Sequence, residues 1–203
     1  MEFSLQGLYA SAFYLLILIN PISKVFFLAS AEDGRQLRKV RAVSTKASIV
    51  AFLILFSFIF LGNIIFTQIF HVDLFSFQIL GGLILFTLGY RALTKGVFYE
   101  SEEHHSIVEQ TVVPLASPLI AGPATITAVI ALTAQNGVFL TTFATLIAIA
   151  INFVIMLSSI GLYKLLKHYN LVGALIRLTG LIVSTISVQM ILEGISRWYA
   201  TLA

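Results

Sequence analysis

The chain has 203 residues, of which 59% are hydrophobic and only 10% are charged. A soluble domain has about 25% charged residues, so this composition excludes an ordinary soluble domain and indicates a membrane protein. The chain has a formal charge of +3 and no cysteine, which excludes disulfides and cysteine-based metal sites. The basic residues cluster beside apolar segments, a distribution that does not indicate nucleic-acid binding.

Six apolar segments are long enough to cross a bilayer as helices, which takes about 20 residues. They cover residues 5–30, 46–70, 74–96, 111–134, 138–163 and 176–199. The first segment has no basic leader and no cleavage-type sequence, so we expect it to remain as a helix. Because the segments take up most of the chain, we expect one all-α integral membrane domain over residues 1–203.

Basic residues follow the first, third and fifth segments, and predict the orientation of the chain. They are Arg35, Arg38, Lys39, Arg41 and Lys46, then Arg91 and Lys95, then Lys164, Lys167 and Arg177. The connections after the second and fourth segments contain no Lys or Arg. The positive-inside rule therefore places the three basic connections in the cytoplasm and both termini outside a plasma (inner) membrane.

Two apolar segments are interrupted by proline, at Asn20-Pro21 and at Gly122-Pro123. Proline removes a backbone donor and clashes with the preceding turn, so a membrane helix cannot pass through it undisturbed. Asn or Gly followed by Pro favours the start of a new helix. We therefore expect the first and fourth segments to be broken at mid-membrane. The alternative is that each proline merely kinks a packed helix.

The two halves of the chain resemble each other. Leu80-Gly81-Gly82-Leu83-Ile84 corresponds to Leu178-Thr179-Gly180-Leu181-Ile182, and the two proline breaks have nearly the same spacing. Residues 1–98 and 107–203 therefore form two expected three-helix repeats. An odd number of helices inverts the second repeat in the membrane, which is the inverted-repeat arrangement of secondary transporters.

Two half-helix N-termini that face each other would form a site for an anionic group, because their N–H groups are unpaired and carry partial positive charge. Freed carbonyls near Ile19 and Ala121 would suit an ammonium group, so the site fits a small zwitterion such as an amino acid. The glycines near the starts of the third and sixth segments are interpreted as close packing or as room for the substrate. The expected substrate-binding residues are Asn20, Pro21, Ser23, Gly81, Gly82, Gly122, Pro123, Thr125, Thr127 and Gly180.

Three further polar residues form a second tier of candidates, Lys24, Asn152 and Thr179. Lys24 lies close to the cytoplasmic end of its segment, so its side chain either extends to the interface or serves the substrate or proton path. Asn152 either bonds a neighbouring helix or contacts the substrate. We expect no metal site, and we interpret the acidic and histidine residues between 102 and 109 as a solvated loop.

The motifs at these breaks resemble those of the MarC family, which includes SnatA-type small neutral amino acid transporters and is similar to the LysE exporter superfamily. The resemblance covers essentially the whole chain. It rests on Ile19-Asn20-Pro21-Ile22, on Gln78-Ile79-Leu80-Gly81-Gly82, and on the run from Val113 through Pro114 and Pro118 to Pro123. Family members often have Gly-Asn where this chain has Ser23-Lys24. The resemblance implies transport of glycine, alanine or similar amino acids, coupled to protons.

The function expected from the sequence is secondary active transport of small neutral amino acids by alternating access. The alternatives are a channel or exporter-type conduit for small solutes, and a regulatory membrane protein without transport activity. We expect neither an enzyme nor a cofactor, because the sequence has no nucleotide-binding loop, no His-Glu-x-x-His and no Gly-x-Ser-x-Gly.

Overall fold

A computed structural model of the chain describes residues 4–30, 37–69, 71–97 and 120–202. Every regular element in these residues is helical, so the described part of the chain is all-α. The elements are α1 (Leu5–Ile19), α2 (Pro21–Ser30), α3 (Leu37–Ile64), the π-helical turn η1 (Ile65–Ile69), α4 (Leu74–Lys95), α6 (Pro123–Asn136), α7 (Val138–Leu157), α8 (Ser159–His168) and α9 (Val172–Ala200).

Within the described residues, five helical segments are long and apolar enough to span a membrane: Leu5–Phe26, Val40–Gly62, Leu74–Lys95, Val138–Leu157 and Val172–Ala200. Large apolar side chains cover their outer faces, and Phe13, Phe139 and Val154 are 66%, 81% and 60% exposed. Such surfaces suit contact with lipid. The predicted segment at 111–134 lies partly outside the described residues, and its described helix is α6.

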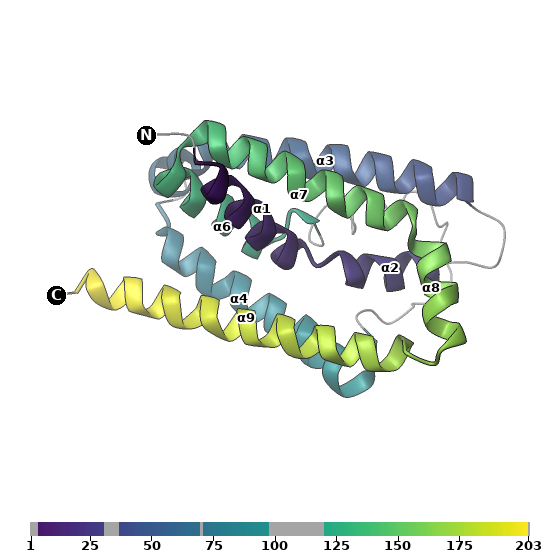
Figure 1. The fold of residues 1–203 in the computed structure, drawn as a ribbon. Helices are drawn as coiled ribbons and strands as arrows, with labels where there is room; N and C mark the ends of the chain where they lie inside the picture. Colours follow the sequence, from purple (N-terminus) through teal and green to yellow (C-terminus); the bar gives the residue numbers. More distant parts are fainter. Residues whose placement is uncertain (1–3, 31–36, 70, 98–119, 203) are drawn as a thin grey trace.

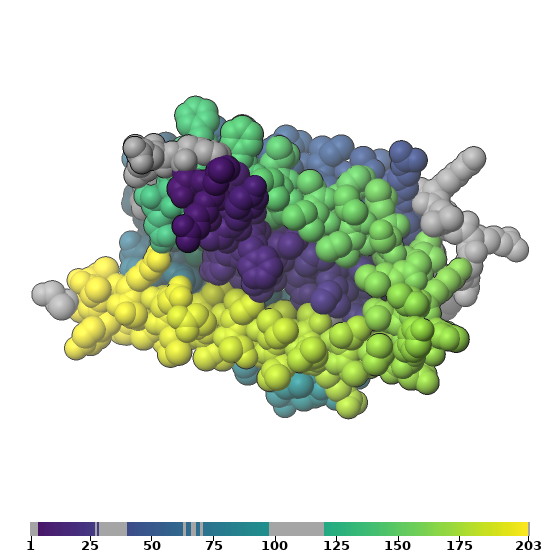
Figure 2. All heavy atoms as spheres, viewed as in Figure 1, coloured from purple at the N-terminus to yellow at the C-terminus, as the bar shows by residue number. Residues whose placement is uncertain are grey.

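The helices lie roughly along one axis, in two groups (Figure 1). Helices α1, α3 and α7 run together on one side, and α4 pairs with α9 on the other. Helix α8 crosses one end of the bundle between α7 and α9. The start of α1 and the end of α9 lie at the opposite end of the bundle. Figure 2 shows α9 running along the length of the molecule, in the lower part of the face in view.

Helices α4 and α9 pack closely because small residues line their antiparallel contact. A Cβ added at Gly180 would lie 2.7 Å from the carbonyl oxygen of Gly89. A Cβ added at Gly82 would lie 2.9 Å from the carbonyl oxygen of Ser187. Lipid tails are as apolar as the helix surfaces, so close backbone packing of this kind stabilises helix pairs in membranes.

Several predicted segment boundaries differ from the observed helices, and two of the differences have a clear physical reason. Helix α3 begins at Leu37 rather than at 46, because hydropathy marks only the apolar part of a helix, and Arg and Lys are good helix formers in its first turns. The segment predicted to end at 163 is interrupted at Ser158, between α7 and α8. The Ser158 hydroxyl donates to the Val154 carbonyl oxygen at 3.1 Å, a bond that often bends helices.

Candidate functional site

The first break lies at Asn20, where α1 ends and α2 begins with Pro21. Asn20 has φ 54° and ψ 73°, the left-handed conformation that Asn adopts more readily than most residues. Its N–H donates to the Leu16 carbonyl at 3.0 Å, and its own carbonyl accepts from the Ser23 N–H at 3.2 Å. One residue thus closes the first helix and starts the second.

The second break lies at Gly122, which has φ −77° and ψ 171° and precedes Pro123, the first residue of α6. Since glycine has no side chain, no side-chain hydrogen bond caps this helix start. The Ile126 N–H donates to the Gly122 carbonyl at 2.9 Å, but the earlier amides of the first turn have no such helical partner. The two helix starts therefore differ, because only at α2 does a side chain accept from the first turn, where the Ser23 N–H donates to the Asn20 Oδ1 at 3.4 Å.

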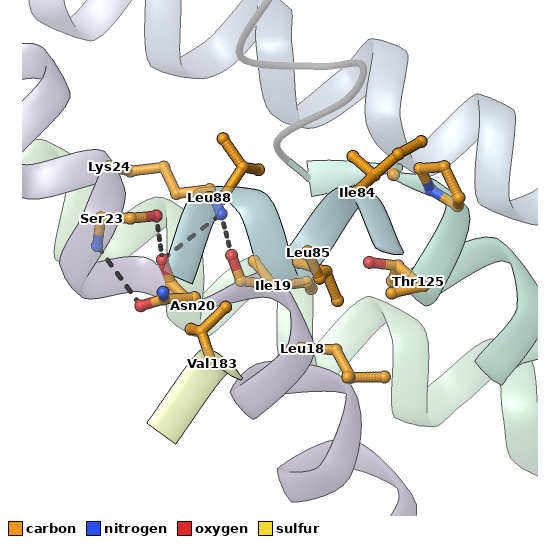
Figure 3. Close-up of a pocket in the computed structure, with 13 residues that line it drawn as sticks. Leu18, Ile19, Asn20, Ser23, Lys24, Ile84, Leu85, Leu88, Thr125 and Val183 are labelled. Atoms are coloured by element: carbon orange, nitrogen blue, oxygen red, sulfur yellow. Dashed lines mark hydrogen bonds between the residues drawn. The ribbon is translucent and has the colours of Figure 1, made fainter. Parts of the chain in front are cut away.

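Both breaks line one small cavity between α1, α2, α4, α6 and α9 (Figure 3). Its volume is about 30 Å³, which holds about two water molecules at roughly 10–15 Å³ each. The lining residues are Leu18, Ile19, Asn20, Ser23, Lys24, Ile84, Leu85, Leu88, Gly122, Pro123, Ala124, Thr125 and Val183. The structure thus brings the two interrupted segments to the same place in the bundle.

Lys24 lies in this cavity, so of the two alternatives given for it, extension of its side chain to the cytoplasmic interface is wrong. The side chain is 1% exposed, and its Nζ donates to the Ile19 carbonyl and, at 3.3 Å, to the Asn20 carbonyl. The break explains this placement, because the end of α1 leaves carbonyls without helical partners. Lys24 is in the first turn of α2, directly beside them.

Only one of the three hydroxyls expected to bind substrate has no partner in the described residues. The Ser23 hydroxyl donates to the Asn20 carbonyl at 2.8 Å, and the Thr127 hydroxyl donates to the Pro123 carbonyl at 2.7 Å. Thr125 is 2% exposed and lines the cavity. Its hydroxyl, unengaged by any described residue, points toward the middle of the lining residues in Figure 3.

The glycines expected in the site lie beside the cavity or outside it. Gly81 faces the start of α6, where an added Cβ would lie 3.1 Å from the Ala124 nitrogen. Gly82 and Gly180 belong to the contact between α4 and α9 described above. Gly81 therefore lets α4 approach the second break, while the other two hold the helix pair together.

The remaining candidates are not among the residues that line the cavity. Pro21 starts α2 without lining it, and Thr179 is buried in α9. Asn152 is fully buried in α7. Its amide nitrogen lies 3.4 Å from the Met156 sulfur, and its amide oxygen has no hydrogen-bond partner among the described residues. Pro21 thus belongs to the first break without facing the cavity, whereas Thr179 and Asn152 belong to neither the breaks nor the lining.

Sequence reasoning missed the apolar wall of the cavity, which is made by Ile84, Leu85 and Leu88 of α4 and by Val183 of α9. The sequence marks these residues only by their position. They lie at the end of the two repeated Leu-x-Gly-Leu-Ile motifs or within the next turn of helix. A buried apolar residue in a membrane helix carries no further sign of its neighbours.

The charge of the cavity depends on one described side chain. Lys24 is the one ionisable side chain among the described residues that line it. The carboxylate of Glu193 lies elsewhere, where it accepts hydrogen bonds from Gln78 at 3.1 Å and Gln189 at 2.9 Å. Among the described residues, the wall of the cavity therefore has a basic group and no acidic partner for it.

Comparison with known proteins gives one family over nearly the whole chain. The model described as "MarC family integral membrane protein" matches residues 5–199. The chain is 34% identical to a UPF0056 membrane protein of Pyrococcus horikoshii over 190 residues, which cover 94% of each chain. It is 29% identical to the UPF0056 inner membrane protein YhgN of Escherichia coli, with 93% of this chain and 96% of the relative covered. No solved structure matches the chain.

Proposed function

Because the chain belongs to the MarC family of integral membrane proteins, we propose that it is a secondary transporter for a small solute that carries a carboxylate. The solute would bind in the cavity between the starts of α2 and α6. The resemblance to SnatA-type proteins makes glycine and alanine the first solutes to test, with protons as the coupling ion.

One observation carries this proposal: two proline breaks distant in sequence meet in one small cavity. Helix α1 has 15 residues and α6 has 14, which at about 1.5 Å per residue makes each about 22 Å long. The hydrocarbon core is about 30 Å thick, so each break falls inside it. Irregular backbone at that depth is tolerated where it lines a cavity or is buried in protein.

The helix contacts support the proposal of two inverted repeats. Helix α2 packs against α7, and the corresponding helix α6, which likewise begins at its proline, packs against α3. Helix α4 packs against α6 and against α9, and α9 packs against α2. Exchange of the two proposed repeats turns the α2–α7 contact into the α6–α3 contact and the α4–α6 contact into the α9–α2 contact, and it leaves the α4–α9 contact unchanged. A carrier of this kind would alternate by rocking one repeat against the other.

The proposed orientation has both termini outside an inner membrane and the basic connections in the cytoplasm. It is supported by the start of α1 and the end of α9 lying at the same end of the bundle (Figure 1). The name of the Escherichia coli relative, an inner membrane protein, agrees with that location.

The experiment is counterflow in proteoliposomes that contain the purified protein. Labelled glycine, alanine and short monocarboxylates are offered outside, with the same unlabelled solute inside and with or without a pH gradient. A carrier gives saturable uptake that rises with internal solute, whereas a channel gives neither effect. Uptake equal to that of empty vesicles for every solute would overturn the proposal.

A pair of variants tests whether the transported solute passes through the cavity. Gly122→Leu adds a large side chain at the second break and should abolish uptake. Gly173→Leu is the matched control, since Gly173 lies at the exposed start of α9 with no atom within 4 Å of an added Cβ. Equal uptake by both variants and the wild-type protein would contradict the proposed site.

A further inference from the structure

The buried amine of Lys24 gives the cavity an unbalanced charge whenever it is protonated. Its side chain is 1% exposed, and the described lining contains no carboxylate. A charge in a membrane interior is costly unless it pairs with an opposite charge or with hydrogen-bond partners. Two main-chain carbonyls supply hydrogen bonds but no net negative charge. The missing counter-charge points to an anionic ligand.

The far wall of the cavity offers donors. Helix α6 begins there with no side-chain cap, and the helix end carries partial positive charge. The Thr125 hydroxyl is nine-tenths or more buried, is unengaged by the described residues, and points into the cluster (Figure 3). An anion between Lys24 and Thr125 would receive hydrogen bonds from both sides.

The carbonyls at the first break that an ammonium group would need are already engaged. The Ile19 and Asn20 carbonyls accept from Lys24, and the Asn20 carbonyl also accepts from Ser23. A zwitterionic amino acid would bring a second ammonium group into a cavity that already holds one cation. Lys24 thus stands where the amino group of such a substrate would bind.

We infer that Lys24 determines specificity, and that this cavity takes a small monoanion without an amino group, of the short-chain monocarboxylate class. The inference rests on the transport function proposed above and names its substrate class. A single lysine balances a single negative charge, and a cavity of about 30 Å³ favours the smallest members of that class.

The first test is binding to the purified protein in detergent, measured by calorimetric titration with propionate, acetate, glycine and alanine. Propionate or acetate should bind at least about 10-fold more tightly than either amino acid, because the ammonium group of the amino acid would lose its hydration beside Lys24 without gaining a free acceptor, and an unmade hydrogen bond of a charged group costs at least that factor. Glycine or alanine binding as tightly as propionate would overturn the inference, and this comparison needs no variant.

The second test is a pair of lysine variants. Lys24→Met should weaken propionate binding about 10-fold or more, whereas Lys46→Met, at an exposed lysine of α3, should leave it unchanged. If Lys24→Met does not fold, Lys24→Gln keeps a donor and removes the charge. Propionate binding unchanged in the folded Lys24 variant would overturn the inference.

These experiments distinguish a failure of the proposed transport function from a failure of the proposed substrate specificity. Propionate binding that depends on Lys24 without counterflow of any solute would support the specificity and contradict the transporter. Counterflow of glycine with no binding or counterflow of propionate would support the transporter and overturn the role given to Lys24.

Discussion

The side chain of Lys24 donates to the main-chain oxygen of Ile19 across the break at Asn20-Pro21. The bond joins the last turn of α1 to the first turn of α2. It also places a basic group at the C-terminal end of α1, where the partial charge of the helix is negative. The geometry of the break and the charge of the cavity are therefore set by the same contact.

The backbone of Asn20 gives a first prediction about stability. The left-handed conformation costs most residues that have a Cβ about 1–2 kcal/mol, whereas Gly and, to a lesser degree, Asn adopt it at lower cost. Asn20→Ala should therefore lower the free energy of unfolding in detergent by about 1–2 kcal/mol, while Asn20→Gly should change it by a few tenths of a kcal/mol. Equal stability of the Ala and wild-type proteins would mean that the φ of 54° is not maintained in solution.

The second prediction separates two threonines that lie two residues apart in α6. Thr125→Ala removes the unengaged hydroxyl in the cavity and should weaken anion binding about 10-fold or more, the value of a hydrogen bond to a charged group. Thr127→Ala removes a hydroxyl that bonds Pro123 within the helix and should leave affinity near the wild-type value. The affinity of both variants is measured by titration with propionate. Equal losses of affinity in the two variants would contradict the placement of the anion beside the Thr125 hydroxyl.

The third prediction concerns the glycines between α4 and α9. An added Cβ at Gly180 would lie 2.7 Å from backbone atoms of the partner helix, so Gly180→Ala should destabilise the protein by about 1–3 kcal/mol through overpacking. Gly173→Ala, at an open position of the same helix, should be neutral or stabilise it by up to about 1 kcal/mol. Thermal unfolding of both variants checks this, and the opposite order would show that the helices are not in close contact.

The fourth prediction tests the orientation. The chain contains no cysteine, so single cysteines can be introduced without a background. Asp73→Cys, between α3 and α4, should react in intact cells with a thiol reagent that does not cross membranes. Lys167→Cys, in α8, should react only after the cells are permeabilised. Both positions are exposed, and the reverse labelling pattern would invert the proposed topology.

The sequence predicted the helical elements well where one physical rule dominates. Long apolar runs predict spans, and α4 at Leu74–Lys95 almost coincides with the predicted segment 74–96. Proline predicts a break, and helices begin at Pro21 and Pro123. The interruption at Ser158 escaped prediction because serine in a membrane helix is ambiguous, and its effect depends on whether its hydroxyl bonds the preceding turn.

The sequence by itself determined the class of protein and the positions of the two breaks, because hydropathy and proline chemistry are local properties of the chain. Only the tertiary structure decided that the breaks meet, that Gly82 and Gly180 pack helices rather than line the cavity, and that Lys24 is buried. A lysine near the end of a membrane helix has two sources of stabilisation, the aqueous interface and any unpaired carbonyl nearby. Which one it uses depends on the distance to each, and that distance is fixed only when α2 starts beside the open end of α1.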